Sequence, residues 1–143
     1  MTQSSAVRVA RVLVVDDEEG IREFVDRTLQ LVGHHTKVAS SGPAALAIAE
    51  SEEPFDLLLT DLRMPGMSGD ELARRIRQRR PEVKVLYLTG FSDQLFKEKG
   101  GMWEGEAFLD KPVSANGLLQ AVSLLLYGEF TENLLGGLPR GRV

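Results

Sequence analysis

A run of acidic residues near the start of the chain is the first feature that could do chemistry. The stretch VLVVDDEEG, Val12 to Gly20, carries four apolar residues directly into four carboxylates. Two carboxylates about 4 Å apart repel each other by about 4 kcal/mol at an effective dielectric constant near 20, so such a cluster normally needs a compensating cation. We therefore expect a positive partner, either a metal ion or a basic side chain, close to Asp16 and Asp17.

Three later apolar runs also end in residues suited to charge chemistry. Asp61 ends the run FDLLLTD, Thr89 lies near the end of VKVLYLTG, and Lys111 follows EAFLD. In a parallel α/β sheet, ligands bind beyond the carboxyl ends of the strands, at the switch point in strand order. If these runs are parallel strands, their ends meet the acid pair at one edge of the sheet.

The expected cluster suits a divalent metal and phosphoryl transfer. Carboxylate oxygens are the ligands that Mg²⁺ prefers, so Asp16, Asp17 and Asp61 form a candidate cradle for Mg²⁺ (or Mn²⁺), and Lys111 adds a fixed positive charge. A carboxylate beside a metal can itself be the nucleophile, and phosphoryl transfer asks the protein mainly for positioning and charge neutralisation. Asp61 is the best candidate acceptor because it stands alone at the end of its strand. Thr89 and Lys111 could then bind phosphoryl oxygens.

The elements that must position these residues follow from the alternation of short apolar runs with amphipathic segments. This alternation predicts parallel strands joined by helices, an α/β fold. We expect strands at 7–16, 35–39, 55–61, 83–90 and 106–110, three of them apolar enough at their centres to be covered on both faces.

Four helices are predicted from the periodicity. The second is alanine-rich and stops at Pro54, the third begins at Ser68 in capping-box spacing and ends before Pro81, and the last begins at Ser114. Between Phe91 and Gly105 we expect only a short, irregular helix, because each glycine there weakens a helix by about 1 kcal/mol. The first helix presents one face made of Ile21, Phe24, Val25, Thr28, Leu29 and Val32, and the last presents Leu118, Leu119, Val122, Leu125 and Leu126.

Composition limits the class of protein. The 143 residues fit one domain with its own core, and the net charge of -4 gives no general attraction to nucleic acid or to an anionic membrane surface. There are no cysteines, which excludes disulfide and thiolate chemistry. Neither a secretory signal nor an apolar run of roughly 18 residues is present, so we expect a soluble, cytoplasmic protein.

Four motifs together make the chain similar to a known family. VVDD, TDLRMPGMSG, LTG and FLDKP occur in order and at compatible separations, and the chain resembles the receiver domain of bacterial two-component response regulators, of the stand-alone chemotaxis type. The resemblance covers residues 8–127 and leaves 1–7 as an N-terminal extension and 128–143 as a C-terminal tail. It implies a three-layer, doubly wound, flavodoxin-like fold with a five-stranded parallel sheet in the order 2-1-3-4-5.

The resemblance also implies a phosphorylation switch. Asp61 would accept a phosphoryl group from a histidine of a sensor kinase or of a histidine phosphotransfer protein, and Thr89 and Lys111 would hold the phosphoryl oxygens. Self-phosphorylation from small donors and slow self-dephosphorylation would be the only reactions of the domain, so we do not expect the chain to be an enzyme. The implied Mg²⁺ ligands are Asp17, Asp61 and the backbone carbonyl of Arg63, with Asp16 acting mostly through water.

The same resemblance implies how the signal leaves the site. Thr89 would move toward the phosphate and Phe108 would turn inward behind it, while a cis peptide bond between Lys111 and Pro112 would aim the lysine inward. The output surface would be formed by the fourth helix, the fifth strand and the fifth helix. The expected downstream partner is a protein, with no direct contact to nucleic acid or membrane, and a phosphorylation-dependent homodimer is left open.

Three other interpretations compete. One is a receiver-fold interaction module that no longer takes phosphate. Another is a haloacid-dehalogenase-like phosphatase, which needs a second acid two residues after its aspartate nucleophile, where this chain has Arg63. A flavin-binding relative of the same topology is disfavoured because the acid pair would repel the flavin phosphate.

Several charged residues have an ordinary structural explanation. Glu18 and Glu19 are expected to be the solvated start of a helix, where acids are favoured. His34 and His35 follow a glycine at a helix end and are expected to cap it or to be exposed. The basic run of the third helix is expected to form a solvated face, and it comprises Arg74, Arg75, Arg77, Arg79 and Arg80.

Overall fold

The computed structural model describes residues 9–51, 53–90 and 105–128, and its centre is a parallel sheet. The strands are hydrogen-bonded in the order β2-β1-β3-β4-β5, and every neighbouring pair is parallel. The predicted fold class and strand order are therefore confirmed. The strands are β1 (Arg11–Val15), β2 (His35–Ala39), β3 (Leu57–Asp61), β4 (Lys84–Thr89) and β5 (Glu106–Asp110).

The three central strands are buried because helices cover both faces of the sheet. All residues of β3 are buried, as are all but the first residues of β1 and β4. Parallel sheets behave in this way because the crossover helices lie on the two faces. The strand predicted at 7–16 is shorter in the structure, since its ladder with β2 and β3 lies within Arg11–Val15 and residues 1–8 fall outside the described part.

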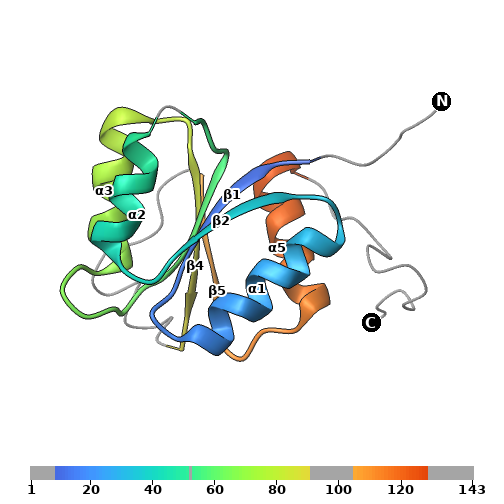
Figure 1. The fold of residues 1–143 in the computed structure, drawn as a ribbon. Coiled ribbons are helices and arrows are strands. Elements are labelled where there is room, and N and C mark those ends of the chain that lie inside the picture. The colour runs from blue at the N-terminus through green and yellow to red at the C-terminus, as the bar shows by residue number, and fades with distance from the viewer. Residues whose placement is uncertain (1–8, 52, 91–104, 129–143) are drawn as a thin grey trace.

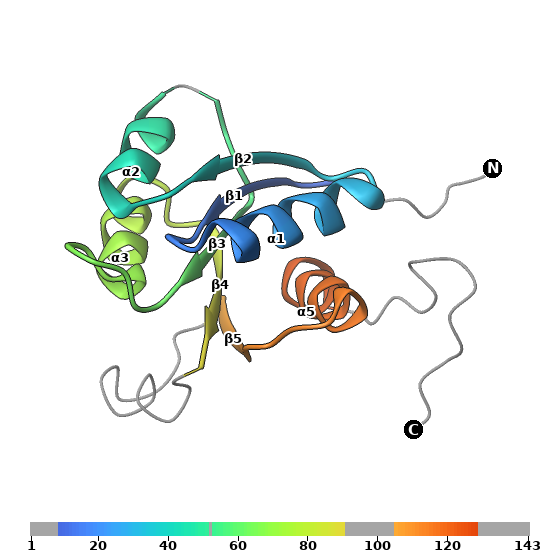
Figure 2. The ribbon, with the colours of Figure 1, turned by 60° about the horizontal axis from the view of Figure 1, so that its bottom comes forward.

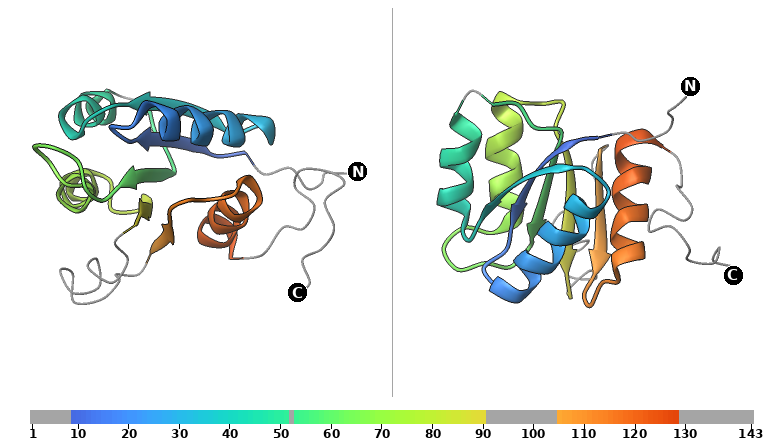
Figure 3. Two further views of the ribbon diagram at one scale, coloured as in Figure 1. Left: turned by 90° about the horizontal axis from the view of Figure 1, so that it is seen from below. Right: turned by 45° about the vertical axis from the view of Figure 1, so that its right-hand side comes forward.

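Two pairs of helices complete the layers. Figures 1 and 3 show α2 and α3 on one face of the sheet and α1 and α5 on the other, and Figure 2 gives the same arrangement from a tilted view. Serines cap three of them: Ser41, Ser68 and Ser114 each accept a hydrogen bond from the backbone N–H three residues later. The helices are α1 (Glu19–Leu31), α2 (Gly42–Glu50), α3 (Gly69–Arg79) and α5 (Ala115–Tyr127).

The core divides into one cluster on each face. Leu72 and Ile76 of α3 pack on one side of the sheet, whereas Val25 of α1 and Leu118 of α5 pack on the other. Among the described residues, no helix combines the length and apolar character needed to cross a bilayer. The irregular helix expected between 91 and 105, and the tail beyond Gly128, lie outside the described residues.

One predicted helix face is narrower than expected. In α1, Val25, Thr28 and Leu29 are buried, but Phe24 remains 37% exposed. Phe24 is at the margin of the apolar stripe, because on a helix of 3.6 residues per turn it points about 100° away from Val25. In α5, Leu118, Leu119 and Val122 are buried, as expected.

His34 caps the end of α1 through its backbone, as expected, because its N–H donates to the carbonyl of Leu29 at 3.1 Å, but its side chain is not exposed. Its ring is buried, and Nδ1 accepts a hydrogen bond of 3.0 Å from the backbone N–H of Ala10. Burial, and secondly the neighbouring His35, lower the pKa of His34. The neutral ring therefore joins the end of α1 to the start of β1.

The basic run on α3 is only partly the solvated face that was expected. Arg74 and Arg75 are exposed and form ion pairs one helical turn back, with Asp70 and Glu71. Arg80 instead lies with its guanidinium 5.0 Å from the ring centre of Phe55. The same guanidinium donates hydrogen bonds to the carbonyls of Ala49, Ser51 and Glu53.

Arg77 belongs to a buried polar network, which also contradicts the solvated interpretation. Its Nη1 lies 3.6 Å from Oε2 of Glu106, whose side chain is fully buried, and its Nε donates to the carbonyl of Val83. The hydroxyl of Tyr87 donates to the same Glu106 oxygen at 3.4 Å. A buried carboxylate needs such partners, and here they connect α3 to β4 and β5.

The loop after β3 packs closely against the strand because of a glycine. The backbone N–H of Gly69 donates to the carbonyl of Leu62 at 2.8 Å. A Cβ atom at Gly69 would lie 2.1 Å from the carbonyl oxygen of Asp61, closer than any real contact. Only glycine therefore fits at the start of α3, and this contact fixes the backbone at Asp61.

Candidate functional site

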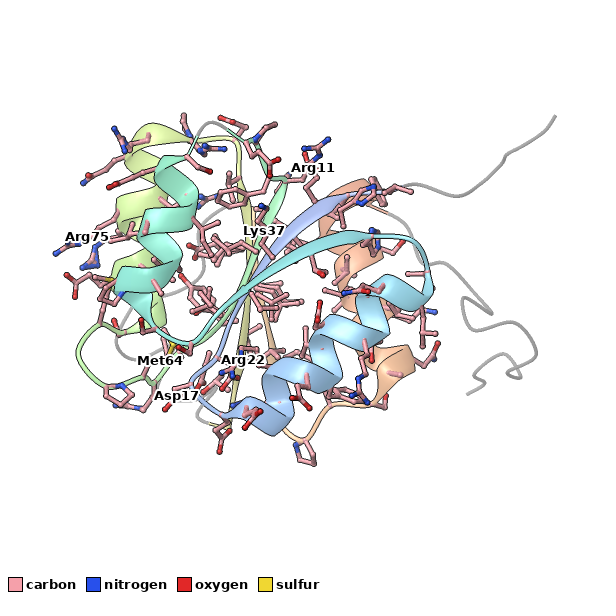
Figure 4. The ribbon with its side chains drawn as sticks, viewed as in Figure 1. Arg11, Asp17, Arg22, Lys37, Met64 and Arg75 are labelled. Atoms are coloured by element: carbon pink, nitrogen blue, oxygen red, sulfur yellow. The ribbon has the colours of Figure 1, made fainter. Side chains whose placement is uncertain are left out.

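The acidic residues meet at the carboxyl edge of the sheet, which faces the viewer in the left panel of Figure 3. Asp16 and Asp17 follow β1, and Asp61 is the last residue of the neighbouring β3. Carboxylate oxygens from these three residues lie within 4.8 Å of one another. Figure 4 shows Asp17 at this end of the molecule, with Arg11 near the opposite end.

Lys111 supplies the positive charge that the acid run requires. Its Nζ lies 3.2 Å from Oδ2 of Asp16, 3.2 Å from Oε1 of Glu18 and 3.5 Å from Oδ2 of Asp61. Asp16 is buried, and within the described residues its Oδ2 accepts no hydrogen bond of normal geometry. The ammonium group is therefore the counter-ion of that buried oxygen.

Local hydrogen bonds hold Asp16 in place. Its Oδ1 accepts from the backbone N–H of Glu18 at 2.9 Å, so the carboxylate closes the turn that starts α1. Arg22, one turn into the helix, donates from Nη1 to the carbonyl of Asp16 at 2.8 Å, and the N–H of Asp16 donates to Ala39 of β2. Figure 4 shows Arg22 close to the Asp17 end of the sheet. The sequence alone assigned Arg22 no role. Its place one turn into the helix that follows Asp16 was the only sign that it could reach this residue.

Lys111 is positioned by the end of β5 and by its neighbour strand. Its backbone N–H donates to the carbonyl of Thr89 at 3.0 Å, and Thr89 is fully buried at the end of β4. The peptide bond between Lys111 and Pro112 is cis. Two adjacent strand ends therefore hold the lysine and the threonine next to each other.

Arg63 lies at this edge, whereas Phe108 lies in the middle of β5. Arg63 is two residues beyond Asp61, with an exposed side chain. Phe108 is partly buried on β5, where it pairs in register with Tyr87 of β4 and packs against the core cluster of α2 and α3. Strand β4 thus lies between Phe108 and β3, the strand that carries Asp61.

Burial and the crowding of charges shift the pKa values of three residues in the cluster. Burial, and then the charge of Asp16, raise the pKa of Asp61 to about 6, although Lys111 and a backbone hydrogen bond from Arg63 oppose this and Asp17 adds to it. Burial also raises the pKa of Asp16. For Lys111, burial lowers the pKa but the nearby carboxylates of Asp61 and Asp16 outweigh it, so the net shift is upward.

The donor set fits a hard divalent cation. Three carboxylates converge and two of them are buried. Within the described part of the chain, the buried Oδ2 of Asp16 has only the Lys111 ammonium as its partner. Mg²⁺ is usually bound by one or two protein carboxylates, with waters and phosphate oxygens completing an octahedron. The cluster of Asp16, Asp17 and Asp61 could therefore hold such an ion beside Lys111.

Comparison with known families agrees with this geometry. The profile of the response regulator receiver domain matches residues 12–123. The chain belongs to this family. It is therefore a receiver domain of the two-component type. Receiver domains generally act as signalling domains, which interact with histidine kinases and with downstream proteins.

Individual relatives show the same domain in different contexts. The receiver domain is 33% identical over 116 residues to the response regulator receiver protein CpdR of Brucella abortus, covering 81% of this chain and 96% of CpdR. It is 36% identical over 121 residues to FleR of Pseudomonas aeruginosa, covering 84% of this chain but only 25% of FleR. The chemotaxis protein CheY4 of Vibrio cholerae is 32% identical, with a TM-score of 0.72 over 83% of this chain and 100% of CheY4.

The raised pKa of Asp61 predicts how folding stability depends on pH. The carboxyl group titrates near 3.8 in the unfolded chain and at about 6 in the folded receiver, so folding becomes less favourable as the pH rises between these values. Two pKa units correspond to about 3 kcal/mol. With metal removed by EDTA, Asp61→Asn should match wild type at pH 4 and be more stable by up to about 3 kcal/mol at pH 7.5 in urea unfolding. Equal stability at pH 7.5 would contradict this assignment.

Proposed function

We propose that this receiver is a phosphoacceptor, in which Asp61 takes a phosphoryl group from a phosphohistidine with the help of Mg²⁺. The observation that carries the proposal is the position of Asp61. It is buried at the end of β3, within 3.5 Å of the Lys111 ammonium and beside the oxygens of Asp16 and Asp17. An acceptor carboxylate needs this combination of a nucleophilic oxygen and nearby positive charge.

The transfer step follows from the residues at the site. A carboxylate oxygen of Asp61 attacks phosphorus, the P–O bond to Asp61 forms, and the P–N bond breaks so that the donor imidazole leaves with the electron pair. The Lys111 ammonium and the Thr89 hydroxyl bind the phosphoryl oxygens and stabilise their charge. Asp16, Asp17, Asp61 and the carbonyl of Arg63 would hold Mg²⁺, which when bound supplies further neutralisation of negative charge.

The signal is proposed to pass from Thr89 to Phe108 and then to the face formed by β5 and α5, where a downstream protein binds. Thr89 is fully buried at the end of β4, and its carbonyl accepts the hydrogen bond of the Lys111 backbone. Phe108 lies on the adjacent strand. A shift of Thr89 toward a phosphoryl group therefore changes the space beside β5.

Phosphorylation can be tested directly with a small donor. Incubation with acetyl phosphate and Mg²⁺ should add one phosphoryl group to wild type, seen in the intact mass, and none to Asp61→Asn. Asp56→Asn is the matched control. Asp56 is an exposed acid directly before the first residue of β3, at the end of the strand opposite Asp61, and it accepts a hydrogen bond from the N–H of Arg11. Equal phosphorylation of Asp61→Asn and wild type would overturn the proposal.

Coupling to the output face can be tested with beryllofluoride, which with Mg²⁺ mimics an acyl phosphate. Amide chemical shifts of β5 and α5 should change in wild type and in Thr28→Ala but remain unchanged in Thr89→Ala. Thr28 is a suitable control because it is an equally buried threonine, on α1 and away from the strand ends. Persistence of the shifts in Thr89→Ala would refute the coupling.

A further inference from the structure

Glu18 contacts the site from a position where a helix cap would be expected. It is the N-cap residue of α1, but its side chain accepts no capping hydrogen bond in that helix. Its Oε1 lies instead 3.2 Å from Nζ of Lys111, 93 residues further along the chain. The expectation that Glu18 is only the solvated start of a helix is therefore incomplete.

The contact with Glu18 is one of three that share a single ammonium group. Asp16 and Asp61, the other two partners of Lys111, are buried, whereas the Glu18 side chain is 64% exposed at the rim of the site. Exposed ion pairs contribute little to folding stability. Any effect of Glu18 must therefore come from the negative charge of its own carboxylate and from the position in which it holds the Lys111 ammonium.

We infer that Glu18 holds the Lys111 ammonium toward the rim of the site and thereby slows the loading of anionic phosphoryl donors onto Asp61. This inference rests on the proposed function, because it concerns the rate of that same transfer. Lys111 must turn to the phosphoryl oxygens of an incoming donor, and Glu18 competes for it during that movement. The Glu18 carboxylate also repels the donor itself, since both are negative.

The competition predicts a dependence on the charge of the donor. With acetyl phosphate, an oxygen of Asp61 attacks phosphorus, the P–O bond to the acetyl group breaks, and acetate leaves with the electron pair. With phosphoramidate, whose nitrogen is already protonated at neutral pH, the same oxygen attacks phosphorus, the P–N bond breaks, and ammonia leaves with the electron pair. Phosphoramidate carries one negative charge less than acetyl phosphate, so it gains less from a released Lys111.

Three variants separate the contact from the general charge of the region. Glu18→Gln removes the charge, Glu18→Asp keeps the charge but shortens the reach to Lys111, and Glu19→Gln removes the same charge from the exposed neighbouring residue in the first turn of α1. Loading rates are measured by rapid mixing and intact mass at saturating Mg²⁺, with each donor. Thermal unfolding of each variant verifies that the fold is intact.

Glu18→Gln should load acetyl phosphate about fivefold faster than wild type, and Glu18→Asp should also be faster, by more than about twofold. The gain should be smaller with phosphoramidate, and Glu19→Gln should stay within about twofold of wild type with both donors.

Two results would overturn the inference alone: rates of both Glu18 variants equal to wild type, or Glu18→Asp equal to wild type while Glu19→Gln matches Glu18→Gln. Failure of wild type to load at all would overturn the proposed function and this inference together.

Discussion

Negative charge at the carboxyl edge of the sheet is the constraint on which the rest of the structure depends. Three carboxylates lie within 4.8 Å of one another, and a fourth, Glu18, stands at their rim. Among the residues that the structure describes, the ammonium of Lys111 contacts Asp16, Glu18 and Asp61. These residues keep an excess of negative charge in a partly buried place. Burial, and then the charge of Asp16, raise the pKa of Asp61, and the excess charge makes the cluster receptive to a divalent cation.

The topology creates this crowding. Because β1 and β3 are adjacent and parallel, Val15 pairs in register with Thr60, and the next residues along the chain, Asp16 and Asp61, become neighbours. The next strands, β4 and β5, bring Thr89 and Lys111 to the same edge. The close approach of Gly69 to the carbonyl of Asp61 then fixes the start of α3 against the end of β3. A different strand order would separate these residues.

Much of this arrangement could be predicted from the sequence, because it follows from local patterns. Apolar runs locate the strands to within a few residues, and four of the five lead into a residue of the site, the exception being the run at 35–39. The strand order was expected only from the resemblance to receiver domains. What escaped prediction depends on contacts between distant segments. The contact of Glu18 with Lys111, the carbonyl contacts of Arg80 and the buried pair of Arg77 with Glu106 join residues whose neighbours in sequence give no sign of them. A run of arginines in the sequence predicts a solvated helix face even where some of the side chains turn inward.

The central claim is that the acids repel one another until a divalent cation joins them, and thermal unfolding of wild type and Asp17→Asn with and without Mg²⁺ tests it most directly. Without metal, the variant should melt at a higher temperature than wild type, because one carboxylate of the crowded set is gone. Mg²⁺ should raise the melting temperature of wild type with increasing concentration and leave that of Asp17→Asn nearly unchanged. A variant that melts below wild type in EDTA, or that gains as much from Mg²⁺ as wild type does, would contradict the account.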